Sequence, residues 1–519
     1  MWIASASKAR REAARPASGL HRAHCACILV LLFAFLVGCH GSSGPESRVL
    51  YVDSRASALT ASGSEDNPFP TITIAVEQAA PGDIILIRPG RYEEALLISK
   101  APLTLRRDPA SRGDHRVVIA PPVGQEGIAI IDPGGGVPET TALVSLDVSD
   151  PSGVGIRVEG ASVRIEDCRV RGSRMVRSED PRTARVGGIG ILALSGSAVT
   201  VVRGEVSGCE GPGILAVESS LTLDQTSVLE NGAEGIRLER CMSASLTDVA
   251  AARNHRAGLA VLSSNAKVVR GVFSETGRVT DRSGQWNYGD GIVVATLEGD
   301  DSQNAISEIE LEGAAVNGNE RIGILMATGA IGTIRDSTIE RNRLGGVWLQ
   351  GNACEGAQDR GCLVANNVFT GNTLVSVNVT VGARATLQGN HLENTNLLEY
   401  IDDSGESNRI AYAVSVLSGA WASVLDNRFA GFSDAGSEKT ADILVQGAAA
   451  GTGLAGNSMD SRTGAPLKIV LQHQENSLGT PDEIVAANPG ATVETIASDK
   501  PISYPVPPFM TDVKVISVQ

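Results

Sequence analysis

The chain is poor in aromatic and in basic residues, and each shortage makes certain classes of partner or substrate less favoured. Aromatic side chains make up 3% of the 519 residues, which is little for a protein that follows a polysaccharide. Lys and Arg number 44 against 59 Asp and Glu, giving a net charge of −15. This acidic balance disfavours nucleic acid and anionic lipid headgroups as partners. It also disfavours a polyuronate substrate unless Ca²⁺, a possible cofactor, bridges the charges.

Long hydrophobic runs are also scarce, because only residues 28–37 form one, and they are too few to span a membrane. Basic residues precede this run: Lys8, Arg10, Arg11, Arg15 and Arg22. The pattern predicts an export signal over residues 1–38. The alternatives are an ordinary cleaved signal or a membrane anchor.

The end of this signal, L36-V-G-C39, resembles the lipobox of bacterial lipoproteins. The resemblance implies that Cys39 receives a diacylglycerol and becomes the new N-terminus, followed by a short linker over 39–47. His40 and Gly41 stand where the inner-membrane retention signal of that family carries Asp. The resemblance therefore implies an outer-membrane lipoprotein, anchored by several acyl chains and facing the periplasm or the surface.

What the chain has in abundance is a repeat. Short strands headed by Gly-Ile, Gly-Leu or Gly-Val recur at intervals of 35, 23, 22, 23, 33, 32 and 23 residues, so a unit of 22 or 23 carries insertions of roughly ten. The leading glycines are Gly155, Gly190, Gly213, Gly235, Gly258, Gly291, Gly323 and Gly346. Each unit adds two further apolar stretches rich in Val, Ile, Thr and Ser, which leucine-rich repeats lack. The chain is predicted to be all-β, a right-handed parallel β-helix of about twelve coils over residues 151–470.

Two features of the repeat have structural explanations. The residue after each glycine, and the one two further on, should point into the core, as in Ile156 and Val158. Asparagines recur at the turns, where they should form a structural ladder: Asn231, Asn254, Asn319, Asn342 and Asn372.

Cysteine is sparse, and five residues remain beyond Cys39. Cys354 and Cys362 lie in one loop, so a disulfide between them is predicted, with two free thiols as the alternative. Cys168, Cys209 and Cys241 are expected to be small core or turn residues. No His or second Cys has the spacing of a metal site, so no metal ligand is assigned.

Residues 48–100 read L50-Y-V-D, N67-P-F-P-T-I, A75-V-E-Q-A-A and G82-D-I-I-L-I-R-P-G-R-Y-E-E. This segment resembles a domain of unknown function at the head of bacterial parallel β-helix proteins of the pectate-lyase-like superfamily. The resemblance implies a short helix that covers the first coil, and residues 48–150 are assigned to this cap and the first coils. Four polar residues here could hold a cation or serve as turn and cap residues: Asp53, Asp66, Asn67 and Asp83.

After residue 470 the repeat fades, and residues 471–519 are rich in proline, which central strands exclude. This segment is expected to cap the last coil or to lie along the flank of the stack.

Enzymes share this predicted fold, but fold alone does not establish an activity. The polygalacturonase motifs N-T-D, D-D, G-H-G and R-I-K and the epimerase motif D-P-H do not occur in the form that those families carry them. The nearest approach to a site is the insertion before Asp290 and the residues that leave the same strand. Candidate catalytic residues there are Arg282, Asp290, Asp300 and Asp301, and candidate ligand-binding residues are Trp286, Tyr288 and Trp348.

Two outward rows of the glycine-led strands are mostly apolar, which an active-site face would not be. The first row is Arg157, Leu192, Leu215, Arg237, Ala260, Val293, Leu325 and Trp348. The second is Glu159, Leu194, Val217, Glu239, Leu262, Ala295, Ala327 and Gln350. This strip must be covered by the C-terminal segment, by the insertions or by a partner. The sequence favours an envelope protein that binds a glycan or a protein without catalysis, with a polysaccharide lyase, epimerase or hydrolase and a passive surface spacer as alternatives.

Overall fold

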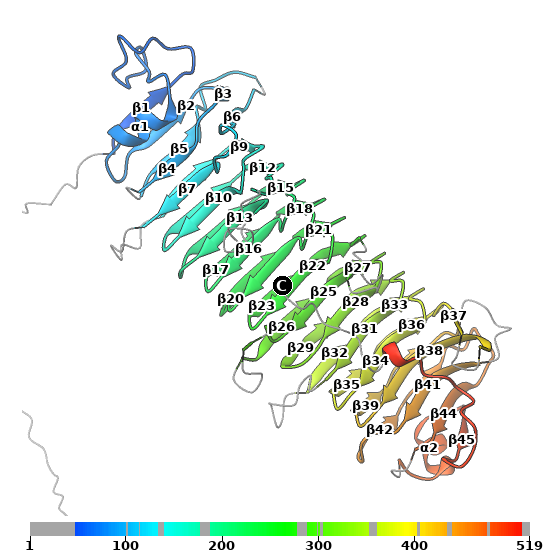
Figure 1. Ribbon diagram of the computed structural model, residues 1–519. Helices are drawn as coiled ribbons and strands as arrows, with labels where there is room; N and C mark the ends of the chain where they lie inside the picture. The colour runs from blue at the N-terminus through cyan, green and yellow to red at the C-terminus, as the bar shows by residue number, and fades with distance from the viewer. Residues whose placement is uncertain are drawn as a thin grey trace, which may run out of the picture. The chain divides into compact units, whose positions relative to one another are not determined.

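The computed structural model describes residues 47–510, apart from 100–101, 114, 133–139, 177–186, 278–287, 298, 301–304, 352–360, 402–404, 433–438 and 475–477. In these residues the chain winds through successive coils, and each coil adds one strand to each of three parallel sheets. Figure 1 shows the coils following one another from the N-terminal to the C-terminal end of the stack. The predicted right-handed parallel β-helix is confirmed.

Sheet A has 15 strands. They are β1 (Val49–Val52), β2 (Ile84–Ile87), β5 (Thr104–Arg107), β8 (Thr141–Val144), β11 (Ser162–Glu166), β14 (Ala198–Val202), β17 (Ser220–Asp224), β20 (Ser243–Thr247), β23 (Asn265–Val269), β26 (Ser307–Glu312), β29 (Ala330–Arg335), β32 (Cys362–Ala365), β35 (Arg384–Gln388), β39 (Trp421–Leu425) and β42 (Gly453–Ala455).

Sheet B has 14 strands, so the described part of the chain has more coils than the sequence indicated. They are β3 (Gly90–Tyr92), β6 (Val117–Ile119), β9 (Leu146–Ser149), β12 (Arg169–Arg171), β15 (Glu205–Ser207), β18 (Ser227–Leu229), β21 (Ala250–Ala252), β24 (Val272–Ser274), β27 (Ala315–Asn317), β30 (Thr338–Glu340), β33 (Val368–Thr370), β36 (His391–Glu393), β40 (Arg428–Phe429) and β43 (Ser458–Met459). The early coils account for part of the difference, and one of them, that of β7, has a leading glycine, Gly127, which the sequence analysis did not include.

Sheet C contains the glycine-led strands and has 16 members. They are β4 (Leu96–Ile98), β7 (Ile128–Ile131), β10 (Val154–Glu159), β13 (Ile189–Leu194), β16 (Ile214–Val217), β19 (Ile236–Glu239), β22 (Ala257–Leu262), β25 (Asp290–Ala295), β28 (Ile322–Met326), β31 (Gly345–Gln350), β34 (Val375–Thr380), β37 (Leu398–Ile401), β38 (Ser407–Leu417), β41 (Lys439–Gln446), β44 (Leu467–Gln472) and β45 (Ala491–Ile496). Strand β37 pairs antiparallel with β38.

The core runs through the centre of the coils and consists of the inward side chains of all three sheets. Ile156, Val158, Ile214 and Met326, which the alternation places inside, are at most 1% exposed. The leading glycine is required because its neighbours are too close for a side chain. A Cβ at Gly291 would lie 2.6 Å from the carbonyl oxygen of Gly323 in the next coil.

Two asparagine ladders stabilise the turns. In the ladder between sheets B and C, Asn231 donates to Asn254 at 2.9 Å, and Asn319 donates to Asn342 at 2.8 Å. These asparagines are at most 1% exposed, so their structural role is confirmed. A second ladder, which the sequence analysis did not identify, lies between sheets A and B and consists of Asn367, Asn390, Asn427, Asn457 and Asn488.

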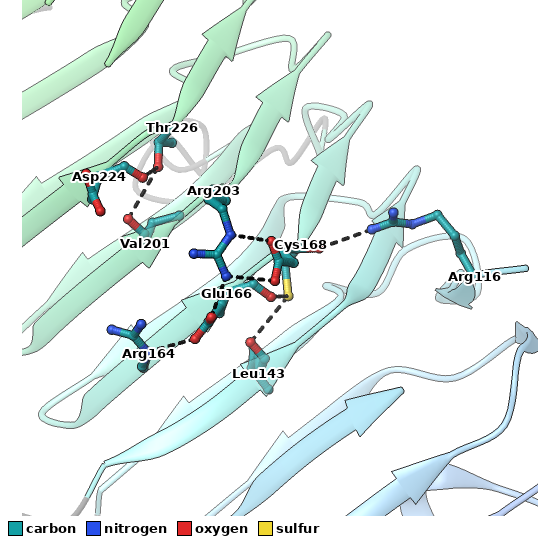
Figure 2. Close-up of polar contacts among 10 residues, drawn as sticks. Arg116, Leu143, Arg164, Glu166, Cys168, Val201, Arg203, Asp224 and Thr226 are labelled. Carbon is teal, nitrogen blue, oxygen red and sulfur yellow. Dashed lines mark hydrogen bonds and ion pairs between the residues drawn. The ribbon is translucent and has the colours of Figure 1, made fainter. Parts of the chain in front are cut away.

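At the A-to-B turns of earlier coils, the thiol of Cys168 and the hydroxyl of Thr226 take the place of asparagine, and charged side chains lie beside them (Figure 2). Arg203 bonds to Asp167 at 2.8 Å and also to Glu166, both from the preceding coil. Cys168 follows, and its thiol donates to the carbonyl oxygen of Leu143 at 3.4 Å. Burial raises the pKa of this thiol to about 12, so Cys168 is a turn residue and not a nucleophile.

Two further free cysteines are turn residues like Cys168. Cys209 and Cys241 are buried free thiols in turns, and burial raises the pKa of each. Cys362 is disulfide-bonded. Cys354, like Cys39, lies outside the described residues, so its pairing with Cys362 stays a prediction.

Both ends of the stack are covered. Helix α1 (Ile72–Gln78) packs Ile72, Ala75 and Val76 at the first coils, as the resemblance implied. At the other end, α2 (Pro481–Ala487) and β45 follow the last coil, and a 3-10 turn, η1 (Pro508–Met510), ends the described chain. The red segment in Figure 1 runs back from β45 over sheet C as far as β34.

Candidate functional site

The outward face of sheet C differs between the two ends of the stack. Its residues align as the repeat predicts, since Leu192 is in register with Leu215, and Leu215 with Arg237. Over β4 to β19 this face is hollowed, and we call this part the open groove. Its outward residues are Leu97, Ala129, Arg157, Leu192, Leu215 and Arg237 in one row and Ile131, Glu159, Leu194, Val217 and Glu239 in the next.

Two hollows make up the open groove. The first has a volume of about 640 Å³ and is lined by residues of β4, β7 and β10, including Leu97, which is 58% exposed. The second has a volume of about 460 Å³ and is lined by residues of β13, β16 and β19. Val154, beside the first hollow, packs with Ile189 and Leu192 of the second, so the two adjoin.

An ion-pair cluster lies in the first hollow. Arg157 donates from Nε to Glu126 at 2.9 Å and from Nη1 to Glu159 at 3.0 Å. The hydrogen bonds to Glu126, with the charge of both carboxylates, raise the pKa of Arg157 further. Both carboxylates are therefore engaged by the guanidinium of Arg157.

The second hollow has a similar cluster that is more deeply buried. Arg237 donates from Nε to Glu239 at 2.6 Å and from Nη1 to Glu234 at 2.9 Å, and the side chains of Arg237 and Glu234 are 6% and 1% exposed. Two atoms of this cluster, Nη2 of Arg237 and Oε2 of Glu234, are buried and have no hydrogen-bond partner among the described residues. A donor and an acceptor that stay unpaired in a lined hollow could receive a ligand.

Over β31 to β44 the same face of sheet C is covered by residues 503–510, and we call this part the tail-covered face. Tyr504 and Met510 are at most 5% exposed and belong to one apolar cluster with Tyr412, Leu444 and Val470. The expectation that the C-terminal segment covers part of the apolar strip is therefore met at this end.

Beneath this tail, sheet C also carries four buried polar side chains among the apolar ones, which the sequence analysis missed because it followed the outward rows only as far as Gln350. Asn378, Ser415, Asp442 and Gln472 are at most 2% exposed, although each points out of the coil. Continuing the alternation from Val377, Val414 and Ile443 would have identified these positions.

Asp442 is the buried carboxyl group of this face. Its Oδ2 accepts a hydrogen bond from the backbone of Lys468 at 2.8 Å, and its Oδ1 has no partner among the described residues. Burial raises the pKa of Asp442 to about 6, because the charged form loses its hydration.

Replacing Asp442 with asparagine should raise the free energy of unfolding by about 2 to 3 kcal/mol at pH 7.5. The pKa of Asp442 is 3.8 in the unfolded state and about 6 in the folded state. Between these pH values the native state therefore binds the proton more tightly than the unfolded state does. Wild-type stability therefore falls as pH rises from about 4 to about 6, and the asparagine avoids that loss. Urea unfolding at pH 4 and pH 7.5 measures the difference.

The advantage of Asp442→Asn should shrink to less than about 1 kcal/mol near pH 4, where the wild-type carboxyl is protonated in the folded state and about half protonated in the unfolded state. Asp499→Asn is the control, since the side chain of Asp499 is 72% exposed. An advantage of equal size at both pH values would show that Asp442 is not the titrating group.

The two described candidate catalytic residues, Asp290 and Asp300, pair with different arginines. Asp290 is fully buried, and it accepts hydrogen bonds from Nε of Arg321 at 2.8 Å and from the backbone of Ile322 at 3.1 Å. Asp300 accepts from Nη2 of Arg240 at 2.8 Å, and these hydrogen bonds lower its pKa. Each carboxylate thus neutralises an arginine. Arg282 and Asp301 lie outside the described residues.

The two described candidate ligand-binding aromatics, Trp348 and Tyr288, differ in how deeply they are buried. Trp348 is fully buried on the outward side of β31, where its Nε1 lies 2.2 Å from where a Cβ of Gly345 would stand. Tyr288 is half-buried, and the guanidinium of Arg256 lies 5.3 Å from the centre of its ring. Trp286 lies outside the described residues.

In the N-terminal cap, Asp53 and Asp83 accept hydrogen bonds from arginines and from backbone amides. Asp53 bonds to Arg55 at 3.0 Å, and this hydrogen bond lowers the pKa of Asp53 to about 2. Asp83 bonds to Nε of Arg48 at 3.1 Å and to the backbone of Ala80 at 2.8 Å.

Within the described ranges, no group of three or more His, Cys, Asp or Glu residues is placed to hold a metal ion. No helix among those same residues is long and apolar enough to cross a membrane.

Comparison with known proteins supports the architecture. Residues 123–273 match the family model described as "Right handed beta helix region". No curated protein matches the chain.

Several solved structures with similar coils carry the names of polysaccharide-active enzymes in their titles. They include pectate lyase Pel9A (14% identity, 66% of this chain, 78% of that chain, TM-score 0.39) and the A-module of mannuronan C-5 epimerase AlgE6 from Azotobacter vinelandii (14%, 83%, 94%, 0.35). A third is the catalytic unit of a GH87 α-1,3-glucanase from Streptomyces thermodiastaticus (15%, 82%, 71%, 0.39). At these values the likeness concerns the fold alone.

Proposed function

We propose that this right-handed parallel β-helix protein is a lipid-anchored binding protein of the cell envelope, which holds a partner in the open groove without altering it chemically. The observation that carries the proposal is the open groove itself, an apolar and hollowed face that described residues leave uncovered at one end of sheet C. Exposed apolar surface of this kind is typical of a binding site.

The chemistry of the open groove supports binding over catalysis. Cleavage or epimerisation of a glycan needs a carboxyl or another side chain that is free to exchange a proton. The acidic residues of the two clusters, Glu126, Glu159, Glu234 and Glu239, are all bonded to Arg157 or Arg237. The alternative, an enzyme with an acidic site at Asp290 and Asp300, has both carboxylates paired with arginines.

Replacing Leu215 with glutamate tests the binding face. Leu215 is half-buried in the second hollow and makes its inner wall with Leu192, so a charge there should weaken retention of any partner at least tenfold. The mature protein, residues 40–519 without lipid, is passed over immobilised bacterial and plant polysaccharides and immobilised envelope proteins.

The matched control is Val272→Glu, because Val272 is 38% exposed on sheet B, away from the groove. Circular dichroism melts establish that both variants fold. If Leu215→Glu is retained as well as the wild type, the open groove is not the binding face, and a passive spacer becomes the better explanation.

The anchor is proposed from the lipobox at Cys39, and it places the protein at the outer membrane. Cells that express the full chain should incorporate labelled palmitate into it, and Cys39→Ser should abolish the label. The reason is that the thiol of Cys39 is the only atom to which the diacylglycerol can be joined in that motif. A label that persists in Cys39→Ser would contradict the assignment.

A further inference from the structure

The tail-covered face shows what kind of ligand sheet C accepts, because it already holds a segment of the chain itself, residues 503–510, which forms no strand and ends in η1. Gln472 accepts at its Oε1 from the backbone nitrogens of Ser503 at 3.0 Å and Tyr504 at 2.8 Å. Its Nε2 donates to the carbonyl oxygen of Tyr504 at 2.7 Å. One amide side chain therefore offers a donor and an acceptor to the main chain of a single residue.

Other outward side chains of sheet C contact the main chain of the tail in the same way. The hydroxyl of Tyr412 donates to the carbonyl oxygen of Pro505 at 2.7 Å. Nδ2 of Asn378 donates to the carbonyl oxygen of Met510 at 2.9 Å. Because these contacts are to backbone atoms, they depend little on the sequence of the peptide.

Apolar side chains of the tail complete this interface. Tyr504 and Met510 are buried, and Val506 and Phe509 pack against the same cluster on sheet C. The ring of Phe509 meets that of Tyr400 edge to face, with centres 6.5 Å apart. Side chains of sheet C thus hydrogen-bond the backbone of this segment, while its apolar side chains pack on apolar residues of the same face.

The open groove has the same two elements on the same face of the same sheet. Its apolar floor is made by Leu192, Leu194, Leu215 and Val217. Its buried and unpaired polar atoms are one donor, Nη2 of Arg237, and one acceptor, Oε2 of Glu234. This pair can meet the carbonyl oxygen and the amide hydrogen of a peptide, as Gln472 does for Tyr504.

The lining of the groove favours a peptide over a glycan. No aromatic residue is found among the described residues that line either hollow, whereas sugar rings pack best on aromatic faces. The charged lining residues include both signs, so the groove does not select a polyanion. Leucine, valine and methionine side chains instead suit the apolar side chains of a peptide.

We propose, on the basis of the binding function above, that the open groove takes a proline-containing peptide with apolar side chains, and that Arg237 and Glu234 bond to its backbone. The second hollow is the centre of this site. The tail-covered face is its intramolecular counterpart.

The experiment uses the full mature protein and an array of 12-residue peptides. The parent peptide has the sequence of residues 499–510, and the others vary it at the positions of Tyr504, Val506, Phe509 and Met510. Peptides that bind are labelled with fluorescein and titrated by fluorescence polarisation. Leu215→Glu and Glu234→Gln should each weaken binding at least tenfold, and Gln472→Leu should leave it unchanged.

Glu234→Gln keeps the size of the side chain and one acceptor oxygen, so a loss with unchanged thermal melting reports on recognition. Loss of binding in Gln472→Leu alone would overturn the proposal, because the peptide would then be exchanging with the tail. Absence of any bound peptide, with retention on a polysaccharide that Leu215→Glu abolishes, would also overturn it while leaving the proposed function intact. If the protein binds no peptide and is retained on no polysaccharide and on no envelope protein, the proposed function itself is refuted.

Discussion

Replacing Asp290 with alanine should lower the free energy of unfolding by about 3 to 5 kcal/mol. Asp290 is fully buried, and the side chain of its partner Arg321 is 3% exposed. Removing the carboxylate takes away the negative charge that Asp290 places against a buried guanidinium, and it also removes the acceptor for the backbone amide of Ile322. Guanidinium unfolding followed by circular dichroism measures the loss.

Asp300→Ala is the control, because Asp300 pairs with an arginine whose side chain is 43% exposed. That change should cost less than about 1 kcal/mol. If Asp290→Ala were as stable as Asp300→Ala, the carboxylate of Asp290 would not be a structural element. A catalytic role for Asp290 would then become plausible again.

Replacing Asn427 with alanine should lower the free energy of unfolding by about 3 to 5 kcal/mol. The amide of Asn427 donates to the carbonyl oxygens of Leu387 at 2.8 Å and of the Asn457 side chain at 3.0 Å. Its Oδ1 accepts from the backbone and the side chain of Asn390, both at 2.9 Å. Alanine removes these four buried hydrogen bonds and keeps only the one from the backbone nitrogen of residue 427 to Asn457.

The matched control is Asn317→Ala, since Asn317 is half-buried on the outer side of sheet B and belongs to neither ladder. This change should stay within about 0.5 kcal/mol of the wild type. Because coils contact only their neighbours, the loss at Asn427 should appear first as faster amide exchange in β39 and β40. Uniform exchange across the stack would contradict a local ladder.

The features of the fold that repeat were predictable from the sequence. A glycine followed by alternating apolar residues fixes which side chains of sheet C face inward, and Ile214 and Met326 are inside as expected. The ladder that begins at Asn231 was predictable for the same reason. The second ladder has an equally regular spacing, but its asparagines, such as Asn390 and Asn427, lie in another turn that the analysis did not follow.

The features that depend on single partners were not predictable. Asp290 pairs with Arg321, which lies 31 residues further along the chain and in the next coil. An insertion separates the coils there, so no periodic signal brings the two together. The path of residues 503–510 over sheet C had no periodic signal either, because its contacts are made by the backbone beside prolines.

The measurement that tests the central claim most directly is the release of new chain ends from a panel of bacterial and plant polysaccharides incubated with the mature protein. It is made with calcium and with a chelator, and retention on each polymer is recorded in parallel. A protein that binds in the open groove without catalysis should release no new ends under either condition. New chain ends that disappear in Asp290→Asn or Asp300→Asn, with folding intact, would contradict the account and establish a polysaccharide-active enzyme.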